Sequence, residues 1–512
     1  MRIISHVSSI RRRLSSLALG LPLLFIISMQ AAGQLPRYEV LFPAQITSGE
    51  FIGDYDLFRA GFSADGLIDS DPMQPKTVSS QNFRELSPVV LPDLMGGYYL
   101  AYTIEYNDSA HKGDRDILMR HIDFAGTNLW GDSATHVAPV AQSSYVEQNP
   151  KLTPLSDGSF LIFYEVWYNS GDVDVAVVRL ARDGSTLWTK WAANSNRREL
   201  LRGAIPNNLG GALALIEAEV YRDTMLLTSD VLIQHVDSSG RIGWKDSEEP
   251  GIVAASPYLE RNSTMVSDGH GGAYIAYELE YNRGERAGDA DILAQHITYY
   301  GSRQWTDEAN PPIVSSNAKA KERNPIMVRD STGIILAFEV SFPFAKGRGT
   351  AHVIGMQRLD SAGRTTWNLG RKSKLIGIGD DIAERPQLVA DPTIGGAYLI
   401  FETRDTATGN RDIYAQRIDS QGDQIWGDGE RPLPVFATPE IEEDAAIAPD
   451  GVGGVVMVAR KHLSSEPVPG YNALVAQRIA LDGTLTWQEM MQAPLTLVSA
   501  TFHGGPPVLL QR

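Results

Sequence analysis

The sequence has no cysteine among its 512 residues. This absence excludes disulfide bonds, thiolate metal sites, a cysteine nucleophile and a lipid-anchored N-terminal cysteine. Basic residues are also few, because 45 Lys and Arg stand against 62 Asp and Glu, which gives a formal net charge of −17. A chain this acidic lacks the basic face that phosphate backbones require, so we expect no nucleic-acid partner.

Long apolar runs are missing except at the N-terminus. There the basic cluster Arg11–Arg13 precedes the apolar run Leu14–Met29, and the small residues Ala31 and Gly33 follow. This order is typical of a secretory signal, and the run is shorter than the roughly 20 residues that span a bilayer. We predict a cleaved signal peptide over residues 1–33 and an exported mature chain that is periplasmic, at the cell surface or extracellular, with no further transmembrane segment. An uncleaved membrane anchor is the alternative.

A helical period of useful length is also absent after the apolar run, and regularly spaced tryptophans are present instead. Seven of the nine tryptophans stand 56 to 62 residues apart, namely Trp130, Trp188, Trp244, Trp305, Trp367, Trp426 and Trp487. Each follows a glycine by four positions, namely Gly126, Gly184, Gly240, Gly301, Gly363, Gly422 and Gly483. Self-similarity at this period indicates a repeat fold.

Each repeat has the pattern of four short strands, A to D, rich in Val, Ile, Tyr and Phe and bounded by Gly, Asp, Asn and Pro. In one repeat we expect strand A over Thr264–Val266, strand B over Ala273–Glu280 and strand C over Asp291–Ile297, with the tryptophan on strand D. Four antiparallel strands repeated radially predict an all-β fold, a single β-propeller domain of eight four-stranded blades over residues 34–512. Seven blades, or a linear β-solenoid, are the alternatives.

The two ends of the repeat region predict how the ring closes. Asp54–Gly66 matches a strand C with its turn, Ser70 stands at the tryptophan position, and the stretch after Val498 matches an A–B turn. An N-terminal C–D half and a C-terminal A–B half would complete one blade and remove two exposed sheet edges. In the alternative, Tyr38–Pro43, which resembles Phe338–Pro343, supplies strand B and leaves only strand A to the C-terminus.

The D-x-x-G-x-x-x-W turn, complete at Asp237–Trp244, resembles two known propeller signatures. These are the tryptophan-docking repeat of quinoprotein-like propellers and the Asp-box of sialidase-like propellers. Together with strands such as DIYAQRID from Asp412, the pattern is most similar to repeats of exported bacterial β-propeller proteins and covers residues 54–512. In those families the turn is structural, so the resemblance implies the architecture and carries over no catalytic residue.

A side chain present in every repeat is expected to serve the scaffold, whereas a site depends on what differs between blades. We therefore interpret the seven tryptophans as packing residues between blades, since each ring buries roughly 150–250 Å². A basic residue also recurs on strand C, at His121, Arg179, His235, His296, Arg358, Arg417 and Arg478. We expect these groups to be hydrogen-bonded, facing the strand-B glutamates Glu165, Glu217, Glu278, Glu339 and Glu402, and not to bind a metal.

A glutamate precedes strand A in all seven repeats, at Glu85, Glu147, Glu199, Glu260, Glu322, Glu384 and Glu442. Strand A is innermost in propellers, so these carboxylates are candidates for the channel mouth, beside Arg84, Arg261, Arg323 and Arg385. A role in fixing the loops is the first interpretation, and a ring that binds a cationic ligand is the alternative. Unpaired carboxylates so close together would raise one another's pKa, so such a ring needs counter-charges.

Acidic residues also open strand C, which makes Asp116, Asp174, Asp291 and Asp412 candidate calcium ligands. Calcium favours oxygen-rich loops, whereas turn capping is the alternative role for these aspartates. We expect no other cofactor.

Loops that break the repeat carry aromatic rings beside polar groups, at Tyr106–Gly113, Tyr221–Ser229, Tyr281–Gly288, Phe342–Gly349 and His462–Gly470. Tyr106, Tyr168 and Tyr281 therefore join Glu147, Glu260, Glu322, Glu384, Arg261, Arg323 and Arg385 as candidate ligand-binding residues. Such aromatic and polar rims suit a peptide, a protein or a glycan.

No hydrolase elbow, zinc-protease helix, Walker loop or dinucleotide fingerprint occurs. The sequence thus predicts an exported, non-catalytic binding or scaffold propeller that recognises its ligand on the face formed by the B–C and D–A loops. The alternative is a carbohydrate-active enzyme, a glycoside hydrolase or lyase, with carboxylates at the channel mouth, and a quinoprotein-like oxidoreductase comes third.

Overall fold

Short strands with buried apolar residues pair antiparallel with their neighbours in sequence along the whole described chain. The computed structural model describes residues 36–45, 54–69, 71–93, 95–108, 111–130, 137–244, 247–305, 312–317, 320–343, 349–367, 373–427, 429, 431–463, 472–487, 493–502 and 506–511. The predicted signal peptide and Ser70 lie outside these residues. Within them, no helix is long and apolar enough to cross a bilayer.

The antiparallel pairings sort the described strands into eight groups of four, numbered here as blades 1 to 8. Blade 1 consists of β32 (Val508–Gln511), β1 (Arg37–Gln45), β2 (Tyr55–Ser63) and β3 (Lys76–Ser79). Blade 2 consists of β4 (Arg84–Pro92), β5 (Tyr98–Glu105), β6 (Arg115–Ile122) and β7 (Ala138–Ala141). Blade 3 consists of β8 (Val146–Pro154), β9 (Phe160–Asn169), β10 (Asp172–Leu180) and β11 (Thr186–Ala193). Blade 4 consists of β12 (Arg198–Pro206), β13 (Gly211–Arg222), β14 (Met225–Asp237) and β15 (Gly251–Ala254).

The second half of the chain repeats this order. Blade 5 consists of β16 (Leu259–Ser267), β17 (Ala273–Glu280), β18 (Ala290–Ile297) and β19 (Ile313–Ser315). Blade 6 consists of β20 (Lys321–Arg329), β21 (Gly333–Pro343), β22 (Thr350–Asp360) and β23 (Lys374–Ile376). Blade 7 consists of β24 (Ile382–Asp391), β25 (Gly396–Arg404), β26 (Arg411–Ile418) and β27 (Leu433–Phe436). Blade 8 consists of β28 (Glu442–Pro449), β29 (Val455–His462), β30 (Asn472–Ile479) and β31 (Leu495–Phe502).

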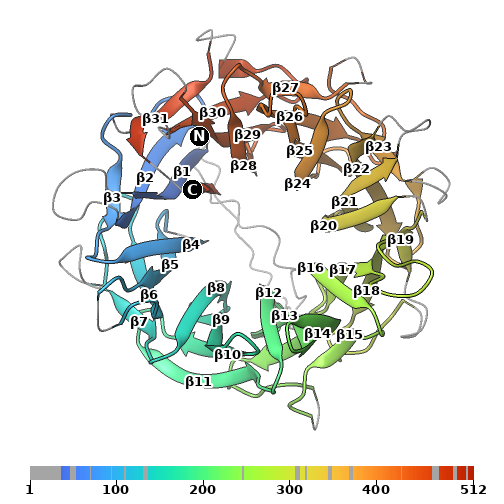
Figure 1. Ribbon diagram of the computed structural model, residues 1–512. Coiled ribbons are helices and arrows are strands. Elements are labelled where there is room, and N and C mark those ends of the chain that lie inside the picture. The colour runs from blue at the N-terminus through green and yellow to red at the C-terminus, as the bar shows by residue number, and fades with distance from the viewer. Residues whose placement is uncertain are drawn as a thin grey trace, which may run out of the picture.

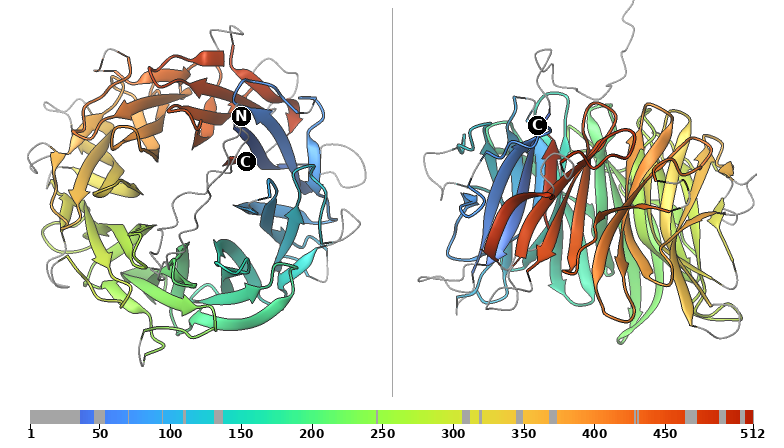
Figure 2. Two further views of the ribbon diagram at one scale, coloured as in Figure 1. Left: turned by 180° about the vertical axis from the view of Figure 1, so that it is seen from behind. Right: turned by 90° about the horizontal axis from the view of Figure 1, so that it is seen from above.

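The blades stand in a ring around a central axis, with the first strand of each blade innermost and the fourth at the rim (Figure 1). The views from behind and from above show the connections gathered on the two flat faces (Figure 2). The prediction of an all-β propeller is confirmed. Since the strands alternate in direction, A–B and C–D turns share one face, and B–C and D–A connections share the other.

The ring closes differently from the arrangement that the sequence favoured. Val498 lies in β31, which pairs with β30 as the outer strand of blade 8, so the C-terminus supplies no A–B hairpin. Only β32 crosses to blade 1, where it pairs with β1 in the register Leu41 to Val508. The N-terminal segment therefore supplies strands B, C and D, because β1 pairs with β2 and β2 pairs with β3. The ring of Tyr38 on β1 also stacks on Phe62 of β2, at 5.3 Å.

The hydrophobic core consists of eight clusters, and each fills the interface between two adjacent blades. In one of them, Leu161 and Phe163 of blade 3 pack with Ala212 and Ile216 of blade 4. Another joins blade 8 to blade 1, and a third joins blade 1 to blade 2, so the ring of clusters is continuous. Each sheet buries both faces, which explains why β5 and β13 are apolar at nearly every position.

The repeated tryptophans dock each blade onto the next. Trp426 of blade 7 donates its indole N–H to the carbonyl of Leu481 in the C–D turn of blade 8, at 3.0 Å. A Cβ on Gly483 of that turn would lie 2.9 Å from the same ring, and this glycine has a φ of +92°, so no side chain fits there. Five further tryptophans make the corresponding bond, namely Trp130, Trp188, Trp244, Trp305 and Trp367. The tryptophans precede strand D and do not form part of it, except Trp188, which lies in β11.

Blade 1 contributes an arginine to this interface. Arg59 of β2 donates to the carbonyl of Ala125 at 2.9 Å, and a Cβ on the adjacent Gly126 would overlap its guanidinium. The same guanidinium pairs with Glu39, which is fully buried. Arg59 therefore occupies the place that an indole takes in the other blades.

Candidate functional site

The strand-A glutamates do not sit in loops at the channel mouth. They lie inside the innermost strands, which begin earlier than predicted, and Glu85, Glu147, Glu199, Glu260, Glu322 and Glu442 are at most 4% exposed. A bulge in strand A of blades 2 to 8 allows this extension, as at Asn149, which has a φ of +57°. These carboxyl groups therefore face a neighbouring blade, so the expectation of a ring at the channel mouth is corrected for the six.

The structure brings several of the predicted site residues together at the interface between blades 2 and 3. Tyr106, which follows β5, donates its hydroxyl to Asp116 Oδ2 at 2.6 Å. The Asp116 carboxyl lies within hydrogen-bonding reach of Glu147 on β8 of the next blade. Glu147 Oε1 accepts a hydrogen bond from the hydroxyl of Ser143. A tyrosine, an aspartate, a glutamate and a serine thus form one cluster across two blades, in which the two carboxyl groups are buried and the serine is exposed.

The same arrangement recurs between blades 3 and 4, where Tyr168, Asp174, Glu199 and Ser195 take the four places. Between blades 5 and 6 the members are Tyr281, Asp291, Glu322 and Ser315. There Arg286 also binds Asp291 at 2.7 Å and stacks on the Tyr281 ring at 3.9 Å. The serines were not identified from the sequence, although Ser-x-x-x-Glu recurs at Ser143, Ser195 and Ser256.

Burial governs the ionisation of these clusters. Burial raises the pKa of Glu147 to about 7, with the Asp116 carboxylate adding to the rise and the Ser143 hydroxyl opposing it. Burial and the Asp174 carboxylate raise the pKa of Glu199 to about 7 against the Ser195 hydroxyl. Burial likewise raises the pKa of Glu322 to about 8. A carboxyl that stays protonated near neutrality can donate a hydrogen bond, which an ionised one cannot.

No candidate calcium site is completed by the described residues. Asp116, Asp174, Asp291 and Asp412 each sit at the start of strand C, but no group of three or more His, Asp or Glu side chains gathers there to hold a metal ion. Burial raises the pKa of Asp412 to about 6, and the nearby Glu442 carboxylate adds to the rise. Calcium binding therefore stays a prediction.

The arginines beside strand A pair with the glutamates of strand B. Arg261 contacts Glu280, and Arg323 of the next blade reaches the same carboxylate at 3.3 Å. Each of these arginines also faces the fully buried Glu278. The sequence suggested that these arginines neutralise Glu260 and Glu322. In the structure they pair with the carboxylates of strand B instead.

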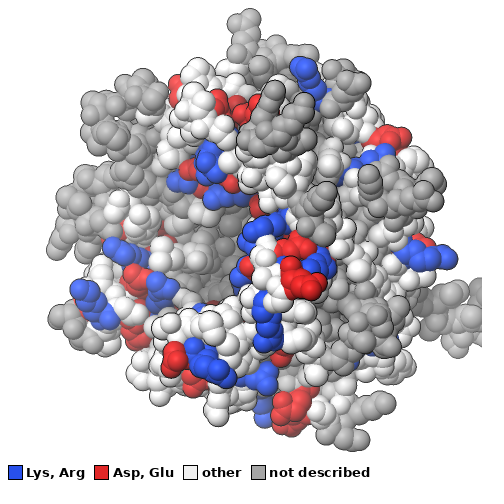
Figure 3. Space-filling model, turned by 45° about the vertical axis from the view of Figure 1, so that its right-hand side comes forward, with Lys and Arg blue, Asp and Glu red and all other residues white. Residues whose placement is uncertain are grey.

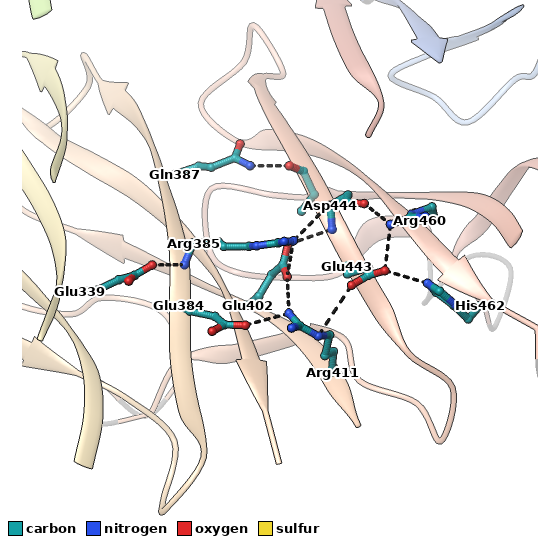
Figure 4. Close-up of polar contacts among 11 residues, drawn as sticks. Glu339, Glu384, Arg385, Gln387, Glu402, Arg411, Glu443, Asp444, Arg460 and His462 are labelled. Atoms are coloured by element: carbon teal, nitrogen blue, oxygen red, sulfur yellow. Dashed lines mark hydrogen bonds and ion pairs between the residues drawn. The ribbon is translucent and has the colours of Figure 1, made fainter. Parts of the chain in front are cut away.

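Among the described residues, the largest network of ion pairs joins blades 7 and 8 (Figure 4). Arg385, whose side chain is 51% exposed, pairs with Glu402 at 3.2 Å and with Asp444 at 3.0 Å. Arg411 binds Glu384 at 2.8 Å and also reaches Glu402. The network continues through Glu443, Arg460 and His462. Glu384 thus differs from the other strand-A glutamates, because its partner is an arginine.

The basic residues of strand C do not face the strand-B glutamates. They pair instead with an acidic or amide residue of the A–B turn in their own blade, as His121 does with Asp93 at 2.9 Å and Arg417 with Asp391 at 2.7 Å. The strand-B glutamates bind the bulged strand A of the next blade, as Glu165 does by accepting the amide of Leu201 at 2.9 Å. Both sets of side chains hold strands and turns together, as we expected for residues that recur from repeat to repeat.

A cavity of about 400 Å³ opens on the B–C and D–A face between blades 5 and 6. Residues 285–289 of one B–C loop line it, together with Lys321 at the start of β20 and Phe342 near the end of β21. Two of the loops that the sequence singled out thus meet at one hollow, although residues 344–348 are outside the described chain. Lys321 was missed, because nothing in the sequence sets it apart from other surface charges, and Glu285 was not named although it lies in the predicted loop Tyr281–Gly288.

Aromatic rings gather on the same face of blade 3. Tyr168 lies 4.7 Å from Tyr145 and 6.4 Å from Trp191, measured between ring centroids. Tyr145 and Trp191 are more than 40% exposed. Tyr221–Ser229, in contrast, is no loop, because β13 and β14 continue as a long hairpin through it.

Around the centre of the ring, positive and negative side chains are intermixed (Figure 3). The channel region is therefore not a surface of one sign, despite the net charge of −17.

No family model matches this chain, and no curated protein matches it. Solved structures resemble it at low identity. The β-propeller domain of the Trilobed protease from Pyrococcus furiosus is 11% identical, with a TM-score of 0.40 over 78% of this chain and 94% of that one. A polysaccharide lyase of family PL25, an ulvan lyase, is 11% identical, with a TM-score of 0.38 over 76% of this chain and 78% of that one. The GH32 β-fructofuranosidase BmSUC1 of Bombyx mori is 10% identical, with a TM-score of 0.33 over 71% of this chain and 90% of that one. At these scores the names of those proteins say nothing about what this chain binds.

Proposed function

We propose that this protein is an exported, non-catalytic binding propeller whose ligand, a peptide, a protein segment or a glycan, docks on the face of the B–C and D–A connections. The observation that carries the proposal is the cavity of about 400 Å³ between blades 5 and 6, which is built from loops that differ between blades. Its lining combines Glu285, Lys321 and the Phe342 ring. Concave sites with an apolar wall and a few polar groups are typical ligand sites.

The alternative, a carbohydrate-active enzyme, needs an accessible acid and base. The carboxyl groups whose pKa lies near 7, such as Glu147 and Glu199, are buried between blades and held by serine hydroxyls. Substrate in the central channel would not reach them. This burial removes Glu147 and Glu199 as the acid and base of such an enzyme, and it leaves Glu285 and Asp289 of the cavity as the carboxyl groups that the enzymatic alternative would use.

The test has two arms, binding and turnover. The secreted chain is screened on glycan and peptide arrays, and a hit is measured by calorimetry for the wild type, Lys321→Ala and Phe342→Ala. We expect at least a tenfold loss of affinity in both variants, and no loss in Lys190→Ala, which removes an exposed lysine of blade 3 outside the cavity.

Release of product from a glycan hit would favour the enzymatic alternative, above all when Glu285→Gln or Asp289→Asn abolishes it. A hit whose affinity is unchanged by the two cavity substitutions would remove the cavity from the proposal.

A further inference from the structure

The outer strand of blade 3, β11, is longer and more exposed than most other outer strands, and it runs along the rim of the ring (Figure 1). Five of its eight residues are exposed, namely Thr186, Leu187, Thr189, Lys190 and Trp191. The outer strands β3, β7, β15, β19, β23 and β27 have only three or four residues. β31 also has eight residues, but Leu497 and Val498 are buried, and the Ser499 amide donates to the carbonyl of Pro72.

A shorter connection in the sequence accounts for this long strand. Glu199 follows Trp188 by 11 positions, whereas 16 or 17 positions separate the tryptophan from the next strand-A glutamate in the five other repeats that have both. In those repeats strand D begins seven or eight positions after the tryptophan, as at Gly251 after Trp244. In blade 3 it begins at Thr186, before the tryptophan. The segment that leads to strand D elsewhere is thus absent from blade 3, and the C–D turn continues directly into β11.

The outer edge of β11 is open. Within the described chain its ladder is with β10 alone, and Trp188 to Trp191 pair with β10 in unbroken register. A strand at a sheet edge presents a row of backbone N–H and C=O groups on its free side, and natural edges are blocked by short strands, proline or charge. β7 and β27 are short and contain Pro139 and Pro434, whereas β11 has no proline and one charged residue, Lys190. Another extended segment can therefore pair with β11.

Exposed apolar side chains accompany this open edge. Leu187 is 50% exposed, and Trp191 is 43% exposed. The Trp191 ring continues through Tyr168 to Tyr145, which is itself 45% exposed. Contiguous exposed apolar surface marks interaction sites on soluble proteins. The edge thus offers both backbone groups and apolar surface to a partner.

The residues of β11 suit pairing with a second copy of the same strand. In an antiparallel pair centred on Thr189, this residue stands opposite Thr189 of the second copy, and threonine pairs across strands are favourable. Lys190 then stands opposite Trp188 of the second copy, so the two lysines do not face each other. The same register brings Leu187 toward Trp191 of the second copy.

The charge of the chain also favours this edge for contact between copies. At a net charge of −17, two copies repel each other over much of their surfaces. β11 has no acidic residue, and its one charge is positive. Two copies can therefore approach at this strand with less repulsion than the net charge implies.

We propose that β11 is a self-association surface, through which two copies join their third blades edge to edge into one continuous sheet with a two-fold axis at Thr189. The contact uses the same residues in both copies, as a two-fold dimer requires. The rim of the ring is convex, so the neighbouring blades curve away from the contact (Figure 1). The cavity between blades 5 and 6 stays free in both copies.

The size of the contact sets the expected affinity. One pair of edge strands buries less than the roughly 1,200 Å² of a standard interface, so the dimer should be weak, with a micromolar Kd. Sedimentation velocity of the secreted chain between about 1 and 200 µM, a range that spans such a Kd, should show a monomer that becomes a dimer.

The decisive variants change Thr189, whose side chain is exposed, so the fold should be kept and the melting temperature should stay the same. Thr189→Lys and Thr189→Glu each place two like charges opposite each other, and each should raise the Kd by at least about tenfold. An equimolar mixture of the two variants should dimerise again, because opposite charges then face each other. The matched control is Ile252→Lys at an exposed apolar position of β15, the outer strand of blade 4, which should leave the Kd unchanged.

Hydrogen exchange locates the contact. The amides of β11 should exchange more slowly at high than at low concentration of the wild type, and equally fast at both concentrations of Thr189→Lys. A wild type that sediments as a monomer throughout the range would overturn the proposal. A dimer that Thr189→Lys leaves intact, or a mixture of the two variants that stays monomeric, would also overturn it.

Discussion

At the scale of single residues, the docking position between blades is occupied by an indole in most of the ring and by Arg59 in blade 1. Both groups donate to a carbonyl of the next C–D turn and cover its glycine. The two groups differ in their other contacts. The Arg59 guanidinium also forms an ion pair with the buried carboxylate of Glu39, which accepts a hydrogen bond from the Tyr98 hydroxyl at 2.8 Å. A charge in this position is stable only with its partner.

We therefore expect Arg59→Ala to lower the free energy of unfolding by about 3–5 kcal/mol, since it leaves Glu39 buried without its guanidinium. Chemical denaturation measures the loss, and Glu39→Gln in the same chain should restore part of it. Arg37→Ala is the control, because Arg37 is exposed and its pair with Asp69 should contribute less than about 1 kcal/mol. Equal losses for the two arginines would contradict this interpretation.

The indoles allow a finer separation of packing and hydrogen bonding. Trp426 is fully buried and bonded to Leu481, so Trp426→Ala should cost about 3–5 kcal/mol. Trp426→Phe keeps most of the ring and loses the bond, which should cost about 1–2 kcal/mol. Denaturation curves compare the two, and a phenylalanine variant as unstable as the alanine variant would show that the hydrogen bond dominates.

At the scale of elements, strand A carries a bulge in blades 2 to 8, and in blades 4 to 8 a strand-B glutamate of the preceding blade accepts an amide of that bulge. In blade 6 the bulge residue Asn324 has a φ of +51°, and its amide donates to Glu278 of blade 5 at 3.3 Å. Its side chain donates to Glu339 of its own blade at 2.9 Å. Because of the bulge, strand A already includes its glutamate, whereas the sequence placed this residue in the loop before the strand. The glutamate side chain is therefore buried between two blades.

This geometry predicts unequal costs for two substitutions at one position. Asn324→Gly loses the bond to Glu339 and keeps the left-handed backbone, so it should cost about 1 kcal/mol. Asn324→Val adds the strain of a β-branched residue at positive φ and should cost about 2–3 kcal/mol. Thermal melts of both variants check this order, and a valine variant as stable as the glycine variant would argue against the bulge.

At the scale of the whole molecule, four residues of the C-terminus complete a sheet whose other strands come from the N-terminus. β32 pairs with β1, and Leu510 is buried in the cluster between blades 1 and 2. Removing it exposes the inner edge of blade 1 and opens the apolar interfaces on both sides. The ring is therefore held by a contact between the two ends of the described chain.

Deletion of residues 506–512 should lower the melting temperature and broaden the transition, because blade 1 loses its innermost strand. Calorimetry measures both, and a synthetic peptide of residues 506–512 added in excess should raise the melting temperature again. An unchanged melt of the truncated chain would count against closure by β32.

Much of the architecture follows from the sequence because the relevant signals are local and repeated. The spacing of the tryptophans, the alternation within strands such as Asp291–Ile297 and the glycine turns all act within a few residues, so they predicted a propeller that the structure confirms. The sequence favoured the C-terminus as the source of strand B in blade 1 and gave Tyr38–Pro43 as the alternative, because no tryptophan follows in that blade to mark the repeat. The pairing of β1 with β2 shows that the N-terminal segment supplies this strand.

The tertiary structure alone decided which candidate residues meet. Tyr106, Asp116 and Glu147 were separate candidates in the sequence, and their meeting depends on how far strand A extends and on which face of the neighbouring blade it packs. Burial and ionisation belong to that interface and not to the local sequence, since desolvation comes from atoms of another blade. The same holds for Arg59, whose role became visible only when the blade without a tryptophan was placed against Ala125.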